Sequence, residues 1–150
     1  MTLRYLNGII NEWWASHAQI NHVYIGSQEE YLTIPNKQYV GVCVEYLQSN
    51  FQAKNIVHQY RFTISDLFNP NIENHNANIY SSLLQIVEDF DMWLRTSEEY
   101  TIQNNLSVIP FDDDSNDRTS GYIFNVNVQI PRVINECQKP VRVDITAPEL

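Results

Sequence analysis

The segment Tyr100–Pro131 is the part of the sequence that most constrains the fold. Two strand-like patterns in it flank an acidic turn, and the second alternates regularly. One side of this second pattern is apolar, at Tyr122, Phe124, Val126, Val128 and Ile130, and the other side carries amides, at Asn125, Asn127 and Gln129. A period of two is typical of a half-buried antiparallel strand. The amide side lacks nucleophiles, bases and metal ligands, so we interpret the segment as architecture.

Length and charge limit the class of protein. A chain of 150 residues fits one domain that buries roughly two thirds of its unfolded surface. The formal net charge of -9 argues against a general nucleic-acid binder, because such proteins neutralise phosphates. Cys43 and Cys137 lack zinc-like spacing and are predicted to be free thiols in a reducing compartment. We find no signal peptide and no apolar run of transmembrane length, which predicts a soluble protein without membrane contact.

Two helices are predicted from apolar residues at helical spacing. The first covers residues 3–17, and the second covers Ile79–Leu94, where preceding asparagines are expected to cap free amides. Lys37–Gln48 and Asn55–Asp66 are predicted to pair as strands. For Ile20–Ile34 we expect two short strands around Gly26 and Ser27.

These elements predict an α+β fold with a mixed, largely antiparallel sheet and two main helices packed on one face. Residues 1–131 would form a single core domain, with Leu67–Asn76 as a loop that crosses to the second helix. Residues 132–150 contain two further prolines and little apolar periodicity, so we expect an extended C-terminal arm.

Several residue groups have a composition that could serve a chemical site. The run Asp112–Arg118 has the carboxylate density of a calcium loop, but it lacks the glycine and the glutamate that an EF-hand requires at fixed positions, which favours an ordinary acidic turn. The histidines do not share a helical face. Dispersed glycines and the lack of a GxSxG elbow argue against phosphate cradles and serine hydrolases. We therefore predict no catalytic, metal or cofactor-binding residues and no enzyme activity.

Two short motifs resemble a known family. One is the H-x-Q-I-N run at His17–Asn21, and the other is the L-x-x-x-P-F-x-x-x-x-x-D hairpin at Leu106–Asp117, followed by Ser120, Gly121 and an aromatic residue. Together with the order of elements, they resemble the neck and tail-terminator proteins of tailed bacteriophages, notably crAss-like and related phages of Bacteroidetes hosts. The similarity covers residues 3 to about 138. It departs at Tyr122, where tryptophan is more usual, and at Val133–Cys137, where the ending Asn135-Glu136-Cys137 only roughly keeps an expected Asn-x-Cys.

The resemblance implies a structural virion protein, assembled in the host bacterial cytoplasm. About 12 copies would form a ring between portal and tail, with other neck, portal or tail proteins as partners and DNA only as a passenger in the lumen. A ring needs two different contact patches on each subunit. We expect one at the acidic hairpin and the loop Leu67–Asn76, and the other on the arm, which would add a strand to a neighbour. The predicted interface residues are Phe111, Asp112, Asp113, Asp114, Arg118, Arg132, Val141, Val143 and Ile145.

Two other classes remain open. One is a small soluble adaptor that recognises a protein partner through the amide face of the last strand and forms no ring. The other is an enzyme, which would require the acidic hairpin to meet His17, His22 or His75 in space.

Overall fold

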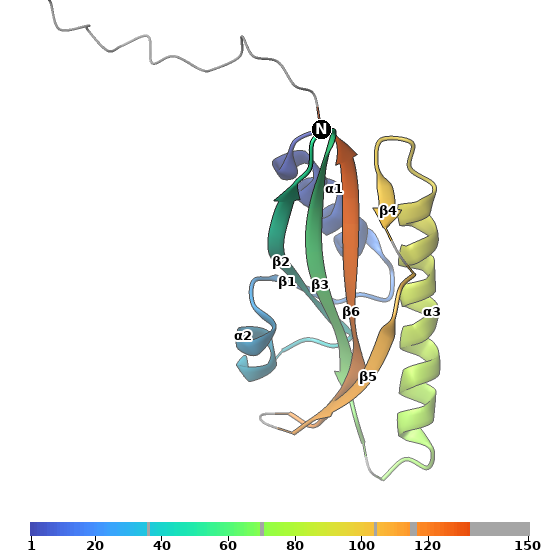
Figure 1. Cartoon of the computed structure of the whole chain (residues 1–150). Coiled ribbons are helices and arrows are strands. Elements are labelled where there is room, and N and C mark those ends of the chain that lie inside the picture. The colour runs from blue at the N-terminus through green and yellow to red at the C-terminus, as the bar shows by residue number, and fades with distance from the viewer. Residues whose placement is uncertain (36, 70, 104, 115–116, 133–150) are drawn as a thin grey trace, which may run out of the picture.

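The fold is built on a six-stranded mixed sheet (Figure 1). The computed structural model describes residues 1–35, 37–69, 71–103, 105–114 and 117–132. The strands lie in the order β1-β2-β3-β6, and the far side of β6 pairs with β4 and with β5. Their bounds are β1 His22–Ile25, β2 Gly41–Phe51, β3 Asn55–Leu67, β4 Thr101–Gln103, β5 Val108–Asp113 and β6 Thr119–Pro131. β1 pairs with β2 in parallel, and the other pairings are antiparallel.

Two long helices, α1 (Leu3–Ser16) and α3 (His75–Arg95), cover one face of the sheet. The contacts meet at Phe62 of β3, whose ring lies 5.9 Å from Trp14 of α1 and 4.9 Å from Phe90 of α3. Phe124 of β6 stacks on Phe62 at 5.2 Å. This arrangement confirms the predicted α+β class with two main helices on one face. None of the described helices is long and apolar enough to cross a membrane.

α1 follows the predicted apolar stripe. The Thr2 side chain accepts a hydrogen bond from the Tyr5 amide at 3.1 Å and so caps the helix, while Leu6, Ile10 and Trp14 are buried. Capping satisfies one of the free amides of the first turn, and the buried stripe holds the helix to the sheet.

α3 begins one turn earlier than predicted, and the expected asparagine cap is wrong. Its N-cap, Asn74, makes no side-chain hydrogen bond to the helix. Asn74 instead adopts the left-handed conformation with φ of 56°, which asparagine tolerates better than most residues. The buried stripe matches the prediction, with Ile79, Leu83, Ile86, Val87, Phe90 and Leu94 in the core.

The prediction for Ile20–Ile34 is half wrong. β1 occupies His22–Ile25, but the second expected strand is the short helix α2 (Gln28–Thr33). The Ser27 hydroxyl accepts a hydrogen bond from the Glu30 amide at 3.1 Å, which caps the helix. Tyr31 anchors α2 on the opposite face of the sheet from the long helices, through a buried hydroxyl contact of 2.8 Å with Ser65.

β2, β3 and β6 form the centre of the sheet, and all three were predicted as strands, although β2 begins at Gly41 and not at Lys37. The β3–β6 pairing runs in register from Asn55 opposite Pro131 to Leu67 opposite Thr119. The side facing α1 and α3 is buried and apolar along β6, and the outer side carries Asn125 and Asn127. β6 therefore has the two-sided character that its alternation indicated.

Candidate functional site

The acidic hairpin joining β5 and β6 is tied to the body of the protein. Asp112 accepts a hydrogen bond from the Ser120 hydroxyl, and the Tyr80 hydroxyl of α3 donates to the Phe111 carbonyl at 3.1 Å. Asp112 and Asp114 are nevertheless exposed. The hairpin thus presents carboxylates from a base that α3 holds in place.

The loop after β3 lies at the same end of the molecule as this hairpin (Figure 1). The Phe68 amide donates to the Arg118 carbonyl at 2.9 Å, and the Arg118 guanidinium lies 4.3 Å from the centre of the Phe68 ring. The His75 ring stacks on the same Phe68 ring, with 5.9 Å between the two ring centres. The two segments predicted to form one patch are therefore neighbours. We call these two segments, Leu67–His75 and Phe111–Arg118, the acidic end.

Lys37 and Tyr39, which carry no carboxylate, lie beside the hairpin. The Tyr39 hydroxyl donates to Asp117 at 3.1 Å, and burial, together with this carboxylate, raises the pKa of Tyr39. Burial lowers the pKa of Lys37, and the nearby Asp113 and Asp117 oppose that change. The charge of Lys37 therefore partly balances the carboxylates on one side of the turn.

The candidates for metal binding and catalysis do not gather into a site. In the described ranges, no three His, Cys, Asp or Glu side chains are grouped as metal ligands. His17 lies 3.6 Å from Asp89 of α3, whereas His75 accepts a hydrogen bond from the Asn69 amide at 2.7 Å. His22 is part of β1. The structure thus places these histidines on separate elements, and of the three it is His75 that lies at the acidic end, where its ring stacks on Phe68.

Cys43 is a free, buried thiol, as predicted, and Cys137 lies outside the described residues. Burial raises the pKa of Cys43 to about 12. A thiol that stays protonated is a poor nucleophile, so Cys43 acts as a packing residue.

Arg132 lies at the opposite end of the sheet from the acidic end. Its amide donates to the Lys54 carbonyl at 2.8 Å, and its guanidinium donates to the Gln52 carbonyl at 3.2 Å. The guanidinium also lies 5.3 Å from the Phe51 ring. Arg132 therefore holds the end of β6 to the turn between β2 and β3. The predicted interface residues Val141, Val143 and Ile145 lie outside the described residues.

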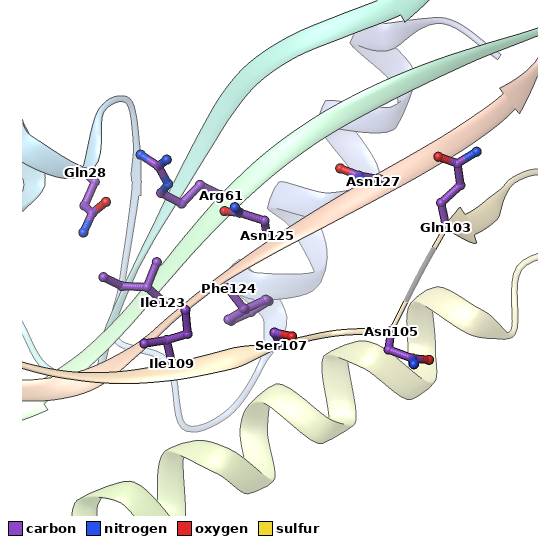
Figure 2. Close-up of a pocket in the computed structure, with 10 residues that line it drawn as sticks. All are labelled: Gln28, Arg61, Gln103, Asn105, Ser107, Ile109, Ile123, Phe124, Asn125 and Asn127. Carbon is purple, nitrogen blue, oxygen red and sulfur yellow. The ribbon is translucent and has the colours of Figure 1, made fainter.

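The outer face of the sheet holds a pocket of about 570 Å³ (Figure 2). Its lining is rich in carboxamides, with Arg61 and Ser107 as further polar groups and with Ile109 and Ile123 as apolar ones. The carboxamides come from α2, β6, β4 and the segment that follows β4: Gln28, Asn125, Asn127, Gln103 and Asn105. Such groups offer both donors and acceptors, which suits a polar, uncharged ligand surface such as a peptide backbone. The sequence pattern indicated Asn125 and Asn127, but the remaining amides reach the pocket only through tertiary structure.

The lateral edge of the sheet next to β2 is only partly covered. β1 pairs with β2 from Gly41 to Val44, and in the described part of the chain no strand covers the same side of Glu45–Phe51. Tyr46 is 43% exposed and Phe51 is 67% exposed, although both lie on the side of the sheet that faces the long helices. We call Glu45–Phe51 the open β2 edge. Sequence reasoning missed it, because nothing local reveals how short β1 is.

A hydrogen-bonded chain lies along the open β2 edge. Ser49 Oγ lies 2.6 Å from Nδ1 of His58, and the Tyr46 hydroxyl contacts the same Ser49 oxygen. His58 is buried, which lowers its pKa. The chain positions Tyr46 beside the edge.

No known protein-family model and no curated protein sequence matches this chain.

Proposed function

We propose that this protein is a structural subunit of a ring in the neck of a tailed bacteriophage, joining the portal or an adaptor to the tail. The motifs at His17–Asn21 and Leu106–Asp117 support this proposal, because they resemble the neck and tail-terminator proteins. The α+β architecture agrees with the fold that this resemblance implies. The protein is made in the host cytoplasm and becomes part of the virion.

The observation that carries the proposal is that the two lateral edges of the sheet differ. One edge is the open β2 edge, with exposed Tyr46 and Phe51. The other is built from β4 and β5, which pair with successive parts of β6. A closed ring uses a head-to-tail contact between two unlike patches, and edges of unlike shape and chemistry supply such a pair.

The charge of the protein suits a channel for DNA. The net charge is -9, and the acidic end exposes Asp112 and Asp114. Carboxylates repel phosphates, so DNA would pass a wall of such subunits without being held. DNA would therefore be a passenger in the lumen.

The test is the composition of purified phage particles whose genome encodes this chain. Quantitative mass spectrometry should find it at about 12 copies per particle, in fixed ratio to the portal protein. Electron microscopy of particles carrying a labelled chain should place it between capsid and tail. A chain that is abundant in infected cells but absent from particles would overturn the proposal.

The amide-lined pocket favours a second candidate, a soluble adaptor that binds a protein partner on the outer sheet face. Asn125 is exposed there, next to Asn127. Under this alternative, Asn125→Arg would abolish partner capture and leave particle assembly unchanged, because the bulky cation blocks the pocket. Under the ring proposal, loss of the chain prevents the joining of heads to tails.

A further inference from the structure

We infer that residues 141–145 of a neighbouring copy add as a strand to the open β2 edge. This inference rests on the proposed ring and names the contact that closes it.

The edge has the properties of an unfinished sheet. β2 continues from Glu45 to Phe51 after its pairing with β1 has ended. The backbone groups of an edge strand favour pairing with another chain, and exposed aromatic side chains increase this tendency. Phe51 is the most exposed of the large apolar residues in the described chain, at 67%. A bulge in β2 lies between Tyr46 and Gln48. Bulges limit uncontrolled pairing, so the edge admits a short strand better than a long one.

The side-chain pattern of the edge matches that of the C-terminal segment. Phe51 lies opposite Ile56, and Tyr46 lies opposite Tyr60, on the side that faces the core. The other side of the edge is polar, with Gln48 opposite Gln59 and with Glu45 in an ion pair of 3.3 Å with Arg61.

In the C-terminal segment, the apolar residues Val141, Val143 and Ile145 alternate with the charged residues Arg142 and Asp144. A strand with this period presents its apolar residues to one face and its charges to the other. Paired with β2, it covers the exposed aromatic rings on one side and places its ionic groups on the side of the sheet that carries Glu45.

The position at which the described chain ends favours pairing of the C-terminal segment with a neighbouring copy over pairing with its own sheet. Arg132 is bound to the turn after Phe51, so the segment departs from the end of the sheet where the open β2 edge also ends. The connection of residues 133–140 spans up to about 28 Å when extended. It contains no glycine and ends in Pro140, a composition that favours an extended course over a tight reversal onto its own sheet. An extended connection reaches the next subunit of a ring.

The test uses the full chain and a fluorescent peptide with the sequence of residues 138–150. Sedimentation velocity first measures the size of the chain. If the chain is a monomer, its open edge should bind the peptide, and fluorescence anisotropy should show saturable binding. A peptide with serine at positions 141, 143 and 145 should not bind. Phe51→Lys should weaken binding about tenfold or more, because it places a charge on the edge. Met92→Lys is the matched control, because Met92 is 60% exposed on α3, and it should bind normally.

If the chain is instead a multimer, Phe51→Lys should dissociate it and Met92→Lys should not. A monomer that fails to bind the peptide would overturn the inference, since its edge is then either closed by its own chain or without affinity. A multimer that Phe51→Lys leaves intact would also overturn it, while the ring itself would stand. Circular dichroism of each variant ensures that lost binding is not lost folding.

Discussion

Among single residues, Gly121 marks the closest backbone approach in the sheet. An added Cβ at this position would lie 1.8 Å from the carbonyl oxygen of Ile64 in β3. Only a glycine lets β6 pass so near β3 there, because backbone atoms cannot yield as a flexible side chain can. The close approach of the two backbones thus explains why the hairpin motif has a glycine at position 121.

We therefore expect Gly121→Ala to destabilise the fold by about 1–3 kcal/mol, as overpacked sites do. Gly8→Ala is the control, because a Cβ on Gly8 of α1 meets nothing within 4 Å. At position 8, alanine should increase the free energy of unfolding by about 0.5–1 kcal/mol, because alanine has a higher helix propensity than glycine. Urea unfolding measures both changes. Equal effects of the two substitutions would argue against the close approach at Gly121.

His58 makes the stability depend on pH. Burial lowers its pKa below the usual value of 6.5, so the unfolded chain takes up a proton first as the pH falls. The stability that neutral His58 contributes is complete above about pH 6.5 and is lost as the pH falls toward the lower folded pKa. Thermal midpoints between pH 8 and pH 5 should fall more steeply for the natural chain than for His58→Gln. Parallel curves would show that His58 does not titrate on unfolding.

Among the elements, α2 has a local helix signal in its sequence. Ser27 is followed three residues later by Glu30, the spacing of a capping box. The prediction of a strand at this position was based on irregular apolar spacing, which does not distinguish a strand from a helix. In the structure, Glu30 accepts a hydrogen bond from the Tyr24 hydroxyl at 2.8 Å, which links α2 to β1. The start of this helix could have been predicted from the sequence.

The Ser27 cap predicts a measurable effect. Ser27→Ala should destabilise the protein by about 1 kcal/mol, because the Glu30 amide loses its side-chain acceptor. Ser27→Asp keeps an acceptor and should retain the stability. Denaturant midpoints of the two variants give the comparison, and equal losses would mean that the cap contributes nothing.

Long periodic elements were predictable, and non-local pairings were not. The apolar stripes of α1 and α3 and the alternation of β6 correctly predicted whether each element is a helix or a strand and which of its faces is buried. Each pattern is set by the one side that faces the core. The parallel pairing of β1 with β2 and the division of one β6 edge between β4 and β5 depend on contacts far apart in the chain. The open β2 edge and most of the amide pocket follow from those pairings, which explains why the sequence alone did not indicate them.

At the scale of the whole molecule, the long strands separate two chemically different ends. Carboxylates, Arg118 and the loop after β3 gather at the acidic end. At the other end, Arg132 closes the turn between β2 and β3. A subunit with unlike ends keeps one polarity in an assembly, which is what a connector between two different structures requires.

This polarity predicts separable effects of the C-terminal segment. Deletion of residues 138–150 should leave the thermal midpoint of the isolated chain within about 2 °C of its original value, because the proposed strand addition gives the segment its contacts in a neighbour. The same deletion should abolish or strongly weaken incorporation into particles, measured by mass spectrometry of purified virions. A full-length chain with serine at positions 141, 143 and 145 is the matched control, and it should fail to assemble in the same way. If the deletion lowers the midpoint by several degrees but assembly persists, the segment belongs to the core of its own domain.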